Sequence, residues 1–411
     1  MKDNDEKMTK NPAELLHSIA ARLKIDLCPD GLYHYDVMVS RRKEELCSFD
    51  MIRRLQDRFD LFGEFYTDVL EAWEDLQSDP DRLSWVNAAS LFIKDVPHKD
   101  ARKVCYPETN GTRGGDMMPL FALLPSVEEA YEEYCRRGLP QEDLDITMQE
   151  YKINLRIVRD HAMGRVGLNA GYASWLCLYA KARIFRHGSL NFEIHQSPSY
   201  CPYLLKNEQS GAIVPVFGKN MVVHRNGVPL GSYGYEDEWG SFDTYFEENV
   251  TAYVGHPATS RHISRERVAF PKNQWELVFG PGDRDLSVHI PRKTDLSPKA
   301  VDRSLAEAVE IANHCYPEWP PKALYCSSWL LSPMLNEILG KGSAITAFSS
   351  RFERFPRKDA GLSVFSFVFP AKFASMESLE ELPENTRLEK ALKQKYLNGQ
   401  RLYTTSGFIL L

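Results

Sequence analysis

The sequence lacks an excess of positive charge, a long apolar run and any closely spaced pair of cysteines. Lysine and arginine number 50 against 57 aspartate and glutamate, for a formal net charge of −7, whereas binding along a nucleic-acid backbone needs clustered positive charge. No apolar run approaches the ~18 residues of a membrane span, and the charged segment 1–7 lacks the apolar stretch of a secretory signal. These absences argue against nucleic acid and membrane as partners and predict a cytoplasmic protein.

The eight cysteines are scattered, and none has the C-x-x-C spacing of metal-binding or redox pairs. A chain of 411 residues buries a core without disulfides, so each cysteine is interpreted as a buried, reduced thiol. His256 and His262 have no third ligand near them in the sequence, and we expect no metal. The sequence also lacks a G-x-S-x-G elbow, a Walker loop, a dinucleotide-binding glycine motif and H-E-x-x-H.

The hydrophobic pattern changes its period near residue 186. Before that point, apolar residues recur every three or four positions, which predicts helices. Leu190, Phe192 and Ile194 then alternate with polar residues, as in a strand with one buried face. We therefore predict an α+β protein with a mainly helical N-terminal domain, residues 1–185, and a mixed α/β C-terminal domain, residues 186–411.

Individual elements are predicted from apolar stripes and capping signals. A helix is expected over 51–70, another begins at the capping box 126–129, and a late helix begins at the capping box 386–389. The glycine-rich segment 111–116 is interpreted as a loop, because no strand precedes it. Strands are expected over 212–217, 221–224, 263–270, 275–278, 286–290, 323–326, 362–369 and 402–411.

Several segments carry a resemblance to a known family. In the C-terminal half they are 286–291 (Leu-Ser-Val-His-Ile-Pro), 326–333 (Cys-Ser-Ser-Trp-Leu-Leu-Ser-Pro) and 382–399. In the N-terminal half they are 137–140, 164–168, 175–176 and 183–193. On these segments the sequence resembles a bacterial family of two-domain acyltransferases, with an N-acyltransferase N-terminal domain and a GNAT-like C-terminal domain.

The resemblance implies an acyl-CoA-dependent N-acyltransferase, with acetyl-CoA or another acyl-CoA as co-substrate, an amine of a small molecule as acceptor, and a homodimer. Such a reaction needs amide donors at a helix start for the pyrophosphate, a base for the amine proton and an acid for the leaving thiolate. The family's phosphate loop reads Arg/Gln-x-x-Gly-x-Gly/Ala, but residues 290–298 contain no glycine. Arg292, Lys293 and Thr294 are the candidate contacts to coenzyme A there.

His289 is the candidate general base. Alternation places it with Ser287 on one face of its strand, at the carboxyl end where ligands gather in α/β sheets. Tyr325, in the next predicted strand, and Ser328, just after its end, are the candidate proton donors to the thiolate. A nucleophilic pair of Cys326 with His289 requires the two strands to be neighbours. The alternative for His289 is a structural role, in which a hydrogen bond of its ring orients the following turn.

An aromatic and acidic segment, 233–242, suggests a different ligand. Aromatic faces flanked by carboxylates can hold a sugar or a cation, and Tyr235 and Trp239 are the candidate substrate-binding residues. The alternative is an irregular loop whose aromatic rings pack on the core. A second hypothesis for the whole chain follows: a non-catalytic small-molecule or sugar-binding protein on a GNAT-like scaffold that has lost the phosphate loop.

Overall fold

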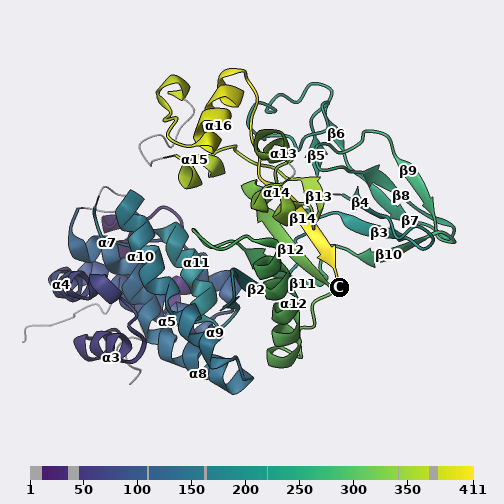
Figure 1. The fold of residues 1–411 in the computed structure, drawn as a ribbon. Coiled ribbons are helices and arrows are strands. Elements are labelled where there is room, and N and C mark those ends of the chain that lie inside the picture. Colours follow the sequence, from purple (N-terminus) through teal and green to yellow (C-terminus); the bar gives the residue numbers. More distant parts are fainter. Residues whose placement is uncertain are drawn as a thin grey trace, which may run out of the picture. The chain divides into compact units, whose positions relative to one another are not determined.

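The computed structural model describes residues 12–35, 46–108, 111–161, 164–219, 221–340, 342–369 and 378–411. The chain divides into two compact units, Met1–Phe185 and Arg186–Leu411. Figure 1 shows helices in the first unit, coloured purple to blue, and sheets with further helices in the second, coloured teal to yellow. The predicted order, a helical region followed by a mixed region, is confirmed.

The first unit is built from packed helices, with α5 and α7 among its most buried segments. Its described α-helices are α1 (Pro12–Arg22), α3 (Phe49–Phe59), α4 (Tyr66–Gln77), α5 (Pro80–Asp95), α6 (His98–Ala101), α7 (Arg113–Leu123), α8 (Val127–Arg137), α9 (Gln141–Met148), α10 (Glu150–His161) and α11 (Ala170–Ala180). Its short 3-10 helices are η1 (Asp30–His34), η2 (Gly63–Phe65) and η3 (Leu124–Ser126).

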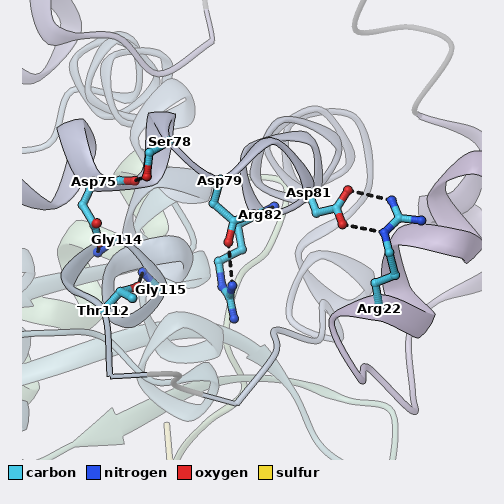
Figure 2. Close-up of polar contacts among 9 residues, drawn as sticks. All are labelled: Arg22, Asp75, Ser78, Asp79, Asp81, Arg82, Thr112, Gly114 and Gly115. Carbon is cyan, nitrogen blue, oxygen red and sulfur yellow. Dashed lines mark hydrogen bonds and ion pairs between the residues drawn. The ribbon is translucent and has the colours of Figure 1, made fainter.

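Side chains fix the starts of two helices in this unit, as Figure 2 shows. Asp79 accepts a hydrogen bond from the Arg82 amide (3.1 Å) at the start of α5, and Thr112 accepts from the Gly115 amide (3.0 Å) at the start of α7. A Cβ on Gly114 would lie 2.6 Å from the Leu76 amide nitrogen, so α7 approaches α4 more closely than any side chain allows. The interpretation of 111–116 as a loop was therefore wrong at residues 113–116, which begin a helix.

Two other helix predictions are corrected. The expected helix 51–70 is two helices, because Asp60 adopts a left-handed conformation (φ 47°) that ends α3, and α4 begins only at Tyr66. Ser126 does not cap α8, because it is already the last residue of η3 and its side chain makes no cap hydrogen bond.

Among the described residues of both units, no helix is long and apolar enough to cross a membrane.

The second unit contains a main sheet of six strands in the order β1-β2-β11-β12-β14-β13. The strands are β1 (Ile184–His187), β2 (Leu190–Gln196), β11 (Arg284–His289), β12 (Ala323–Ser328), β13 (Glu353–Pro356) and β14 (Thr405–Leu410). β11 and β12 are parallel, whereas β2 pairs antiparallel with β11 and β14 pairs antiparallel with β12. The carboxyl ends of β11 and β12 therefore lie at the same edge of the sheet.

A second sheet has the order β10-β3-β4-β8-β7, with β9 paired to β8. Its strands are β3 (Tyr203–Asn207), β4 (Ile213–Phe217), β7 (Phe246–Glu248), β8 (Ala252–Pro257), β9 (Val268–Pro271) and β10 (Trp275–Phe279), and β5 (Val222–Val223) pairs separately with β6 (Phe242–Asp243). Leu204 and Phe217 of this sheet join Phe355 and Phe408 of the main sheet in one hydrophobic cluster. The second sheet therefore packs against one face of the main sheet.

The helices of this unit are α12 (Pro298–Cys315), α13 (Met334–Leu339), α14 (Ala344–Ser349), α15 (Ser363–Phe367) and α16 (Arg387–Leu397), with η4 (Trp329–Leu331) and η6 (Leu379–Glu381). The capping box at the start of α16 is confirmed: Thr386 and Glu389 each accept from the other's amide, at 3.1 and 2.7 Å. The strand expected over 362–369 was wrong. Val364 and Phe365 lie in a helix, since a short apolar run fits a buried helix as well as a strand.

Candidate functional site

One face of β2 and β11 is made of polar residues. In their antiparallel register, His195 is the partner of Asp285, Glu193 of Ser287, and Asn191 of His289. Cross-strand partners point to the same side of a sheet, so these residues form a single surface, which we call the polar face: Asn191, Glu193, His195, Asp285, Ser287 and His289. Its acids are buried, with Glu193 5% and Asp285 0% exposed.

The polar face contains two histidine–carboxylate pairs. His289 Nε2 lies 3.0 Å from Glu193 Oε2, and His195 Nδ1 lies 2.7 Å from Asp285 Oδ1. The side chains of His289 and His195 are 32% and 22% exposed, whereas those of their carboxylate partners are 6% and 0% exposed. A partly exposed imidazole held by a buried carboxylate is the arrangement of a general base and its orienting group.

Burial and the contact with His195 act in opposite directions on the pKa of Asp285. Burial raises the pKa of Asp285 above its usual value, and the hydrogen bond and charge of His195 act in the opposite direction. Its second oxygen, Oδ2, is buried and has no hydrogen-bond partner among the residues that the structure describes. A buried carboxylate with one unsatisfied oxygen costs stability.

A chain of hydroxyl groups extends the polar face across β12 and β14. The His195 ring stacks on the Tyr325 ring, with centroids 5.6 Å apart and planes at 6°. Tyr325 Oη lies 3.1 Å from Ser406 Oγ, Ser406 Oγ lies 3.0 Å from Ser327 Oγ, and Arg357 Nη1 donates to Ser327 Oγ at 2.5 Å. Burial raises the pKa of Tyr325 well above its usual value, so its hydroxyl keeps its proton.

Ser328 and Cys326 lie on the opposite face of the sheet. Val288 and Cys326 are register partners, which places Cys326 and, two residues on, Ser328 away from the side of His289. Ser328 Oγ accepts a hydrogen bond from the Leu330 amide (3.1 Å) at the start of η4. Cys326 is fully buried, and burial raises the pKa of its thiol. The two strands are neighbours, but the idea of a Cys326–His289 nucleophile pair was wrong.

The loop between β11 and α12 holds the three predicted contacts to coenzyme A. The Thr294 hydroxyl donates to the Ser189 carbonyl, and the Arg292 guanidinium lies over the Phe367 ring, 5.2 Å from its centroid. Lys293 has a left-handed backbone conformation, with φ 58°. The three residues are consecutive in the loop, but the side chains of Thr294 and Arg292 contact different parts of the protein.

The start of α12 is already occupied by a protein carboxylate. Asp295 Oδ1 accepts from the Ser297 amide at 2.8 Å, and Asp295 Oδ2 lies 3.0 Å from the Ser297 hydroxyl. Ser297 itself makes no side-chain cap hydrogen bond to the helix. A carboxylate at this position repels a phosphate and uses an amide that a phosphate loop would offer.

Tyr235 and Trp239, the predicted substrate contacts, are separated by the fold. Tyr235 lines a cavity of about 170 Å³, together with Arg357 and Tyr403. Trp239 is 78% exposed and packs only against the Arg225 guanidinium, 5.0 Å from its ring centroid, among the ring and cation contacts of the described residues. The structure therefore assigns these two aromatic residues to different surroundings.

Neither a metal cluster nor a disulfide was found in the part of the chain that the structure describes. No group of three or more His, Cys, Asp or Glu gathers as metal ligands among these residues. The eight cysteines are free thiols, and Cys47, Cys177, Cys201, Cys315 and Cys326 are buried. The interpretation of every cysteine as buried was wrong for Cys135, which is exposed, because it lies on the solvent side of α8.

Two protein families match the sequence, and solved structures match the fold. The GNAT-like C-terminal domain matches residues 184–409, and the N-acyltransferase N-terminal domain matches residues 50–181. A crystal structure of an acyltransferase mutant in complex with octanoyl-CoA has a TM-score of 0.66 at 16% identity, covering 96% of this chain and 99% of that one. An acyltransferase in complex with decanoyl-CoA and teicoplanin has a TM-score of 0.65 at 18% identity, with the same coverage. No curated protein matches.

Proposed function

The chain belongs to the family that joins an N-acyltransferase N-terminal domain to a GNAT-like C-terminal domain, and we propose that it transfers an acyl group from coenzyme A to an amine of a small molecule. The two matches confirm the family resemblance seen in the sequence and the GNAT-like fold class. The polar face carries the proposal, since it places two histidine–carboxylate pairs at the strands where the reaction needs a base. Relatives of the same fold bind octanoyl-CoA and decanoyl-CoA, which supports an acyl-CoA as donor.

The reaction requires a proton to leave the amine as its nitrogen attacks the thioester carbonyl. His289 is the proposed base: Glu193 holds Nε2 and stabilises the imidazolium that forms when Nδ1 takes the proton. Of the two histidines, His289 has the more exposed side chain and lies at the carboxyl end of β11, where a ligand at this edge of the sheet arrives. Glu193 is then a positioning residue, because it acts through His289.

Collapse of the tetrahedral intermediate breaks the bond between carbon and sulfur and releases a thiolate, which must gain a proton. Tyr325 and Ser328 are the proposed donors, and Tyr325 fits better, because it lies on the same side of the sheet as His289. Ser406 Oγ, 3.1 Å from Tyr325 Oη, supplies a second hydroxyl to the same chain. The amine proton and the thiol proton therefore pass through groups on one side of the sheet.

Isothermal titration calorimetry of the intact protein with octanoyl-CoA, decanoyl-CoA and free coenzyme A tests the proposal. We expect dissociation constants in the micromolar range, followed by thiol release when a panel of amines, teicoplanin among them, is added. Absence of binding at millimolar acyl-CoA contradicts the proposal.

A second function, a binding protein without catalysis, is favoured by one observation. The loop before α12 has no glycine, and Asp295 occupies the helix start where a phosphate loop would offer amides. On this hypothesis a sugar or another small molecule binds, whereas acyl-CoA does not, and no amine in the panel releases thiol. Calorimetry with monosaccharides and amino sugars beside the acyl-CoA series separates the two functions.

A further inference from the structure

A cavity in the second unit is lined by several cationic side chains. Its volume is about 170 Å³, and its lining includes Arg261, Arg357, Arg401, Tyr235, Tyr403 and Thr405. None of the described residues that line it is acidic. An apolar cavity of about 150 Å³ holds one benzene molecule, so this one has room for a phosphate group.

The arginines of the cavity have few anionic partners. Arg357 donates to the Ser327 hydroxyl at 2.5 Å and makes no ion pair within the described part of the chain. Arg401 Nη1 donates to two backbone carbonyls, at 2.8 and 3.0 Å, and its Nε is buried without a hydrogen-bond partner among the described residues. Arg261 pairs with Glu337 at 2.7 Å, but that carboxylate is shared with Lys395 at 3.0 Å.

Arginines gathered around one small cavity repel each other unless an anion lies between them. The planar guanidinium fork matches the oxygens of phosphate, and hydrogen bonds to a charged group are about twice as strong as neutral ones. Hydroxyl groups of Ser332, Tyr403 and Thr405 also line the cavity. Burial raises the pKa of Tyr403, so it offers a neutral hydroxyl and adds no negative charge.

The cavity lies at the edge of the main sheet where β12 ends. Ser332 follows η4, which follows β12 directly; Arg357 follows β13, and Thr405 begins β14. Because β11 and β12 are parallel, His289 at the end of β11 lies at the same edge. Arg357 also contacts Ser327 of the hydroxyl chain, so the cavity adjoins that chain.

We propose that this cavity binds a phosphate group, and, resting on the proposed function, that the phosphate is one of those of the acyl-CoA donor. Acyl-CoA carries a pyrophosphate and a 3′-phosphate, and the loop before α12 is poorly suited to hold them. Asp295 already accepts from the Ser297 amide there, and Thr294 is bonded to the Ser189 carbonyl. Phosphate recognition has therefore moved from helix amides to arginine side chains.

Calorimetry of the full chain with coenzyme A, dephospho-coenzyme A and adenosine 3′,5′-bisphosphate tests this proposal. We expect Arg261→Gln and Arg357→Gln each to weaken binding of coenzyme A and of the bisphosphate by about tenfold or more. Arg292→Gln tests the competing site in the loop before α12. The matched control is Arg225→Gln, since Arg225 lies outside the cavity lining and contacts the exposed Trp239. Thermal melting of every variant shows whether it folds.

The outcomes separate the two proposals. Coenzyme A binding that is lost in Arg292→Gln but kept in both cavity variants overturns the phosphate cavity and leaves the acyltransferase standing. Bisphosphate binding that depends on Arg261 and Arg357, without any binding of coenzyme A or acyl-CoA, supports the cavity and contradicts the acyl donor. If neither coenzyme A nor the bisphosphate binds at millimolar concentration, the cavity proposal fails. If the two cavity variants lose less affinity for dephospho-coenzyme A than for coenzyme A, the group bound in the cavity is the 3′-phosphate.

Discussion

The two faces of β2 and β11 are both buried, but they differ in chemistry. On one face, Phe192, Leu286 and Val288 are apolar and at most 1% exposed. On the other, Glu193 and Asp285 are almost as deeply buried and each holds a histidine. Apolar burial stabilises a fold by about 25 cal/mol per Å², whereas a buried ion pair is often neutral or costly. The apolar face therefore stabilises the sheet, whereas the polar face adds little stability and is where we propose that the chemistry takes place.

The largest effect on stability is expected from the apolar face. Phe192→Ala removes a fully buried ring from the centre of β2 and should lower the free energy of unfolding by about 3–5 kcal/mol. Ile194→Val, two residues further along the same face of β2, is the matched control and should lower the free energy of unfolding by about 0.5–1.5 kcal/mol. Urea denaturation measures both. A loss below that of the control would show that this face is not the packed one.

The polar face should respond in activity more than in stability. Glu193→Gln keeps the shape of the side chain but removes the charge that stabilises protonated His289, so turnover should fall by about tenfold or more. Glu193→Asp, which keeps the charge, should recover part of the rate. Initial rates of thiol release measure both variants, and unchanged turnover in Glu193→Gln would remove Glu193 from the site.

A smaller effect, confined to the pH dependence of stability, is expected at Asp285. Burial raises its pKa in the folded state above the unfolded value of 3.8, so between the two values the folded protein binds more protons than the unfolded one. The free energy of unfolding contributed by this group then falls as pH rises through that window. Asp285→Asn removes the contribution, so the variant should gain stability relative to the parent as pH rises. Urea denaturation across a pH series shows the sign, and the opposite trend would contradict it.

The alternation in the sequence predicted much of this site. The pattern around Leu190, Phe192 and Ile194 predicted a strand with polar residues on the other face, and the pattern around Ser287 and His289 did the same for β11. The sequence could not show that the polar residues of β2 and β11 lie side by side and form one surface. The strands are about ninety residues apart, and their register depends on non-local pairing.

Other features depended on tertiary contacts that leave a weak signal in the sequence. Strands β3, β8 and β13 were not predicted, because they are short and lack clear alternation. The left-handed Asp60 that ends α3 is not a glycine, and the nearby signal for a break in the predicted helix 51–70 was Gly63, which also has a positive φ (52°). Arg357 and Arg401 gave no motif, since the segments around them meet only in the folded sheet.

Replacement of His289 tests most directly the claim that the polar face carries the chemistry. The measurement is the rate of thiol release from octanoyl-CoA in the presence of the amine panel, for the parent chain and for His289→Ala, with thermal melting of both. We expect a rate lowered by about 10²–10⁴-fold, as for loss of a general base, and a melting temperature close to that of the parent. A fully active His289→Ala protein would show that His289 is not the base.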